Sequence, residues 1–184
     1  SDLRRQRQMC IRDRSNGTYL DGEDIKLASD VGPGNCLIDL VAMRYFGMPY
    51  DEDGKIAASG QIDYQLLHSL LDKIRTKGYP RADDKSYYYN LDELKSDKPE
   101  NLLATLCELT ALCISDFCHS FDTSGEILLH GGGIKNNFLM ERLDKNIGSS
   151  FKLTDHLIPS KFVESAAFAY LAYLKRGLLV EPRR

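Results

Sequence analysis

The apolar residues of the chain follow two different periods, and their order predicts alternating strands and helices. Strand-like runs are expected at four places: 18–20, 24–30, 126–130 and 151–153. Helical spacing is expected at five places: 35–46, 62–76, 100–121, 136–145 and 162–176. The segment 78–100 is polar, rich in tyrosine and turn-like, so we expect a loop there. Strands that alternate with helices predict an α/β domain with a largely parallel sheet.

Glycine and proline mark the boundaries between these runs. Asp21-Gly22 is typical of a hairpin turn and separates the first two strand-like runs. Gly47-Met48-Pro49 ends the first predicted helix, and residues 51–54 form a polar turn before a short alanine-rich segment. Two glycine-rich loops, at 32–34 and 131–133, each follow a strand-like run and precede a helical one. Ligand contacts are expected at such loops in an α/β fold.

The first fourteen residues show no helical or strand periodicity that supports an element. They contain five arginines and two aspartates, and they resemble translated read-through of a sequencing adapter more than a protein motif. A basic arm that binds nucleic acid is the alternative. We therefore expect residues 1–14 to be non-native or disordered, residues 15–178 to form the domain, and residues 179–184 to be a tail.

Composition argues against several classes of function. The 184 residues are 42% hydrophobic and 28% charged, and the net charge of -3 predicts no basic surface for nucleic acid or an anionic membrane. No apolar run approaches the roughly 20 residues of a membrane span. The five cysteines contain no CxxC pair, so we expect buried apolar packing in a reducing cytoplasm and no metal site made of cysteine.

The first candidate site is the run from Asp30 to Asn35. Asp30 ends a strand, where open α/β sheets bind ligands. Gly32 and Gly34 leave room for a phosphate to approach the backbone, and the following helix offers its N-terminal amides, with Asn35 placed as a cap. A tight turn from strand to helix, without a ligand, is the other interpretation.

The second candidate site is Gly131-Gly132-Gly133, with Asn136 at the start of the next helix. Three successive glycines remove the side chains from one edge of a cleft, so that adenosine or phosphates would lie flat against the backbone. A flexible turn is the alternative. Two loops that both follow strands and precede helices predict a nucleotide cleft more specifically than either loop does alone.

Several motifs in this order resemble the anhydro-N-acetylmuramic acid kinase family, which belongs to the ATPase superfamily of actin, sugar kinases and heat-shock chaperones. The family's Asp-Thr-Gly-Pro-Gly-Asn is similar to residues 30–35, and its Tyr-Asp-x-x-Gly to residues 50–54. Its Lys-Ser, Ala-Thr-Leu and Gly-Gly-Gly runs are similar to residues 85–86, 104–106 and 131–133. The likeness covers about residues 16–176. It departs at Val31, which replaces Thr, and at 87–89, where three tyrosines replace Thr-Gly-Arg.

The resemblance implies a ribonuclease H-like C-terminal domain of a two-domain sugar kinase, with a mixed, mostly parallel sheet flanked by helices. It implies an enzyme that uses ATP and Mg²⁺ to convert 1,6-anhydro-N-acetylmuramic acid and water to N-acetylmuramic acid 6-phosphate in cell-wall recycling. Asp30 would be the general base, and no residue is assigned to a metal. The ATP contacts would come from seven residues: Gly32, Gly34, Asn35, Gly131, Gly132, Gly133 and Asn136.

The resemblance also implies that an N-terminal domain carrying most of the sugar contacts is missing from this chain, and that a homodimer is possible. We therefore expect the chain alone to be inactive. Two alternative functions remain open: a non-catalytic nucleotide-binding or interaction module, and another sugar kinase of the same superfamily.

Overall fold

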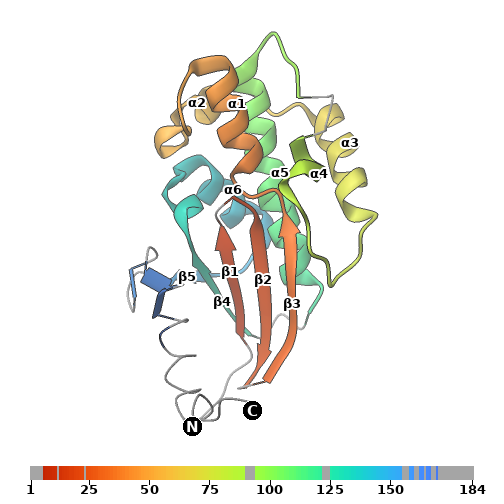
Figure 1. Cartoon of the computed structure of the whole chain (residues 1–184), viewed down its shortest axis with the longest axis vertical. Coiled ribbons are helices and arrows are strands. Elements are labelled where there is room, and N and C mark those ends of the chain that lie inside the picture. Colours follow the sequence, from red (N-terminus) through yellow and green to blue (C-terminus); the bar gives the residue numbers. More distant parts are fainter. Residues whose placement is uncertain are drawn as a thin grey trace, which may run out of the picture.

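A five-stranded mixed sheet forms the centre of the fold (Figure 1), in the order β3-β2-β1-β4-β5. Its strands are β1 (Gln6–Ile11), β2 (Ser15–Asp21), β3 (Asp24–Gly32), β4 (Glu126–His130) and β5 (Phe151–Leu153). β1 and β3 both pair with β2 in the antiparallel direction, whereas β4 pairs in parallel with β1 and with β5. Among the described residues, two of the four strand pairs are parallel, which is a smaller share than the sequence predicted. The two antiparallel pairs are those that the first three strands form.

The structure is a computed structural model that describes residues 6–11, 13–22, 24–89, 94–121, 125–154, 158–159, 162–163, 165–166 and 169. The predicted helix at 162–176 lies largely outside these residues, and the predicted tail at 179–184 lies wholly outside them.

The expectation that residues 1–14 lie outside the fold is wrong for β1. This strand occupies the middle of the sheet, where Gln8 pairs with Thr18 of β2 on one side and with Leu128 of β4 on the other. Ile11 at its end is fully buried. The sequence of β1 shows no alternation of apolar and polar residues, because its three apolar residues, Met9 to Ile11, follow one another. Backbone pairing on both sides shows the strand. The origin of these residues stays a prediction.

The helices confirm most of the predicted pattern. In chain order they are α1 (Cys36–Phe46), η1 (Glu52–Gly54), α2 (Lys55–Ser59), α3 (Tyr64–Arg75), α4 (Lys85–Tyr89), α5 (Pro99–His119), η2 (Gly132–Lys135) and α6 (Asn137–Ile147). Gly47 ends α1 in the left-handed conformation, and the Asp63 carboxylate caps α3. The 78–100 loop contains a helix that was not predicted, α4, because the fully buried Tyr88 anchors this polar segment to the core.

The long helix α5 is the central support of the domain. It packs against α1, α2, α3, α6 and the sheet strands β2 and β3. It is long and apolar enough to cross a membrane, but 83% of its most apolar window is buried inside the domain, as expected for a core helix. Three of its residues are cysteines, and all three are buried thiols that form no disulfide among the described residues, which confirms the packing role predicted for them.

Candidate functional site

A cavity of about 430 Å³ lies where α1, η1 and η2 meet, beyond the carboxyl ends of β3 and β4. Figure 1 shows β1 and β3 running toward the end of the molecule that carries α1 and α2. Both predicted loops contribute to the cavity, Asn35 from the first and Gly132 and Asn136 from the second. The remaining lining residues were not predicted: Ile38, Asp39, Tyr50, Asp51, Glu52, Asp53 and Lys135. The structure therefore joins two loops that lie about a hundred residues apart in the chain.

The first loop is held from behind by α5. Gly34 has a φ of 56°, and its carbonyl accepts a 2.9 Å hydrogen bond from the buried Thr110 hydroxyl. A Cβ on Gly32 would lie 2.7 Å from the Cβ of Cys113, so this glycine permits close packing of β3 on α5. Neither glycine lines the cavity. Packing against α5 therefore also explains the glycines of this loop.

Asn35 lines the cavity but does not cap α1, which corrects the predicted capping role. Its backbone is already helical, with φ and ψ of -87° and -9°, and its side chain makes no cap hydrogen bond. The Asn35 Oδ1 atom is buried and has no hydrogen-bond partner among the described residues. A hydroxyl or amino group entering the cavity would supply the missing donor.

The three glycines of the second loop have different surroundings. Gly131 has a φ of 98°, and a Cβ there would lie 2.5 Å from the carbonyl oxygen of Ile11. A Cβ on Gly133 would also collide with Ile11. Gly132 is exposed, and a Cβ on it would meet nothing within 4 Å. Gly131 and Gly133 thus pack η2 against β1, and Gly132 is the glycine that presents its backbone to the cavity.

Asn136 and η1 form a rigid wall of the cavity. The Asn136 carboxamide accepts a 2.9 Å hydrogen bond from the Leu139 amide, which confirms that Asn136 starts α6. A Cβ on Gly54 would collide with this carboxamide, so η1 can lie against η2 only with glycine at position 54. The Asp51 carboxylate accepts 2.9 Å hydrogen bonds from two backbone amides of α2. Asp51 therefore fixes the shape of the wall.

The cavity is acidic, with four carboxylates and one lysine among its lining residues. The pKa of Asp39 is raised to about 6, chiefly by burial and also by the nearby Asp13, against the opposing effect of Lys85. Asp39 lies one helical turn after Asn35, so the spacing of four residues along a helix could have placed both on one face. A cavity with this charge favours groups that donate hydrogen bonds, or cations, over bare phosphates.

Asp30 lies on the edge strand β3 and is not among the residues that line the cavity. Its side chain is 13% exposed. Its Oδ2 atom accepts a 2.9 Å hydrogen bond from Arg14 and a 2.7 Å hydrogen bond from the Asp83 backbone amide. Among the described residues, both hydrogen-bond donors to this carboxylate bind Oδ2, and they fix its orientation. Oδ1 accepts no hydrogen bond from these residues and can accept a proton.

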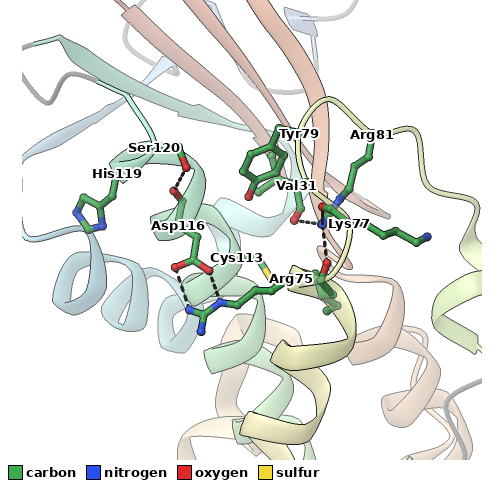
Figure 2. A pocket seen from close by; sticks show the side chains of 11 residues that line it. Val31, Arg75, Lys77, Tyr79, Arg81, Cys113, Asp116, His119 and Ser120 are labelled. Carbon is green, nitrogen blue, oxygen red and sulfur yellow. Dashed lines mark hydrogen bonds and ion pairs between the residues drawn. The ribbon is translucent and has the colours of Figure 1, made fainter.

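A second cavity, of about 380 Å³, lies between the end of α3, the segment that follows it, and α5 (Figure 2). Its basic side chains have protein partners. Arg75 makes hydrogen bonds of 2.8 and 3.0 Å to the carboxylate of Asp116. Lys77 lies 3.3 Å from the centre of the Tyr87 ring, and Arg81 donates to neighbouring backbone carbonyls. Because these charges are already satisfied, we assign this cavity no ligand.

Comparison with known sequences identifies one family. A family model described as anhydro-N-acetylmuramic acid kinase matches residues 8–179. Proteins of that name from Pseudomonas savastanoi pv. phaseolicola and Aliivibrio fischeri are 37% and 35% identical over 173 and 170 residues. Each alignment covers 86% of this chain and 46% of the relative. The chain therefore spans about half the length of the curated relatives it matches.

Comparison with solved structures shows the fold. The activator of the 2-hydroxyisocaproyl-CoA dehydratase from Clostridium difficile, with bound ADPNP, has a TM-score of 0.53 at 11% identity, and the match covers all of this chain and 65% of that chain. Component A of the (R)-2-hydroxyglutaryl-CoA dehydratase from Acidaminococcus fermentans has a TM-score of 0.50 at 8% identity, covering 83% and 55%. The likeness shows a shared fold, in agreement with the α/β class predicted from the sequence.

Proposed function

Because the chain belongs to the anhydro-N-acetylmuramic acid kinase family, we propose that the full-length protein phosphorylates 1,6-anhydro-N-acetylmuramic acid with ATP. Water opens the anhydro ring in the same reaction, and the product is N-acetylmuramic acid 6-phosphate, as in cytoplasmic recycling of the cell wall. The observation that carries this proposal is the cavity that the Asn35 and Gly132 loops form together. This chain supplies the nucleotide half of the site, and the other half of the enzyme supplies most of the sugar contacts.

The charge of the cavity orients the nucleotide. A triphosphate is repelled by the Glu52 and Asp53 carboxylates of η1 that line it, whereas ribose hydroxyls and the adenine amino group donate hydrogen bonds. The buried Asn35 Oδ1 atom is a further acceptor for such a donor. We therefore place the nucleoside in the cavity against the exposed backbone of Gly132. The phosphates then extend past the cavity toward β3, where Asp30 lies.

A magnesium ion bound with the nucleotide offsets negative charge on the transferring phosphoryl group. Magnesium sites of kinases use one or two protein carboxylates together with substrate phosphates. The donor set fits that pattern, because Asp39 borders the cavity while the described residues contain no group of three or more metal-binding side chains. Asp39 is the carboxylate of this chain that would hold the ion.

Asp30 is the proposed general base. Its open Oδ1 atom accepts a proton from the attacking water, whose oxygen forms a bond to the anomeric carbon of the sugar. The bond between the anomeric carbon and O6 breaks, and O6 takes the γ-phosphoryl group as ADP leaves. Oδ2, held by Arg14 and the Asp83 amide, fixes the direction of the carboxylate during this step.

An Asp30→Asn variant of the full-length protein tests this assignment. The substitution preserves shape but removes the base, so turnover should fall by at least ~100-fold while ATP affinity stays within about twofold. Asp24→Asn is the matched control, because Asp24 lies on the same strand with a side chain that is 77% exposed. Turnover of Asp30→Asn close to the wild-type rate would rule out the base assignment.

A nucleotide-binding module without catalysis is the alternative function. The upstream coding sequence separates the two functions. An in-frame domain with a Gly-Thr-Ser-x-Asp-Gly loop supports the kinase, whereas a stop codon followed by a start codon shortly before β1 supports the module.

A further inference from the structure

We propose that Asp83 is a positioning residue, which holds the segment from Tyr79 to Tyr88 against β3 and thereby fixes the carboxylate of Asp30. The role rests on the proposed function, in which Asp30 is the base. Asp83 does not touch the reacting atoms and acts through its backbone amide, 2.7 Å from the Asp30 Oδ2 atom.

The segment after α3 runs along the free edge of the sheet. β3 is an edge strand, and such a strand leaves backbone groups unpaired unless another segment covers them. The Asp30 amide donates a 2.9 Å hydrogen bond to the Arg81 carbonyl, and the Arg81 amide donates a 2.9 Å hydrogen bond to the Ser29 hydroxyl. The Arg81 guanidinium also donates to the Val31 carbonyl. These contacts place the segment beside the proposed base and make the geometry of Asp30 depend on it.

A buried carboxylate fastens this segment. The Asp83 side chain is 1% exposed and accepts a 2.5 Å hydrogen bond from the hydroxyl of the fully buried Tyr88. It also pairs with Arg81 at 2.9 Å and with Lys77 at 3.3 Å. Burial, followed by the hydrogen bond to Asp83, raises the pKa of Tyr88 above its usual range, so the phenol remains a donor. A buried carboxylate with three partners holds its backbone firmly, because removing its charge leaves the buried Arg81 guanidinium without its ion-pair partner.

Arg14 supports the same arrangement, because its guanidinium donates both to the Asp30 Oδ2 atom and to the Asp83 backbone carbonyl. The hydrogen bond from the Asp83 amide to Asp30 is a separate contact. The Asp30–Asp83 contact joins two residues that both lie within the matched family region. No pattern in the sequence indicated this contact, because an aspartate in a polar loop is usually solvated.

Kinetics of the full-length protein test the positioning role. Asp83→Asn should lower kcat by about 10- to 100-fold and leave the KM for ATP within about twofold, because the nucleotide cavity does not include the segment. Tyr88→Phe keeps the packing and removes only one donor, so a smaller loss of kcat in the same direction is expected. Asp84→Asn is the matched control, since Asp84 is exposed and its side chain bonds only locally to the Ser86 amide.

Hydrogen exchange gives a readout that does not need turnover. The Asp83 amide should exchange faster in Asp30→Ala, which removes its acceptor, and amides of 79–88 should exchange faster in Asp83→Asn but not in Asp84→Asn. Unchanged exchange in the first two variants would overturn the contact itself. Faster exchange with kcat within twofold of wild type would overturn the positioning role. An inactive wild-type protein would instead contradict the proposed function, and the exchange rates would still decide whether Asp83 holds Asp30.

Discussion

Replacing Thr110 by valine tests how the first glycine loop is supported. The Thr110 side chain is fully buried on α5, and its hydroxyl donates a 2.9 Å hydrogen bond to the Gly34 carbonyl. Valine has a similar shape but leaves this buried carbonyl without its donor, at a cost of about 1–3 kcal/mol. That loss lowers the folding equilibrium constant by roughly 5- to 150-fold, since about 1.4 kcal/mol corresponds to a factor of ten.

Equilibrium urea unfolding measures the change. With a slope of about 2 kcal/mol per molar urea for a domain of this size, the midpoint should fall by about 0.5–1.5 M at unchanged slope. Thr154→Val is the matched control, because the Thr154 hydroxyl is buried without a hydrogen-bond partner in the described part of the chain. This control should leave the midpoint unchanged or raise it slightly. Equal midpoints for the Thr110 variant and wild type would refute the view that this bond supports the loop.

Two further predictions concern Gly54 in the cavity wall and the Asp39 carboxyl group. Gly54→Ala should lower the melting temperature more than Gly148→Ala, because both glycines are left-handed, at φ of 71° and 65°, but only at position 54 would the Cβ collide with Asn136. Burial raises the pKa of Asp39 from 3.8 to about 6, so its stabilising contribution is present below pH 3.8 and is lost as the pH rises through about 6. Asp39→Asn should therefore raise the urea midpoint at neutral pH, and this gain should vanish in acid; a gain that grows in acid would contradict the sign.

The order of elements was predictable from local patterns, but the roles of individual glycines were not. Helical spacing and flanking turn residues predicted α1, α3, α5 and α6 to within a few residues. A glycine run shows only that side chains are excluded. Whether a ligand or another strand requires the space depends on contacts across the fold, and Ile11 of β1 requires it at Gly131 and Gly133.

Two parts of the site lay beyond the reach of sequence patterns. β1 is central, yet its three polar residues are followed by three apolar ones, so its pairing with β2 and β4 left no alternating signal. Asp83 lies in a polar segment, and its burial depends on Tyr88 and on the edge of β3, which come together only in the folded chain. Asp39 differs from these, because its spacing from Asn35 in α1 was visible in the sequence.

The most direct test of the proposed kinase is the mass of the product formed by the full-length protein from ATP and 1,6-anhydro-N-acetylmuramic acid. The mechanism predicts a sugar that gains one phosphoryl group and one water together, with one ADP released for each sugar. A phosphorylated sugar that keeps its anhydro ring would contradict the role of Asp30 as the base that activates water. ATP binding without any change in the mass of the sugar would contradict the kinase assignment itself.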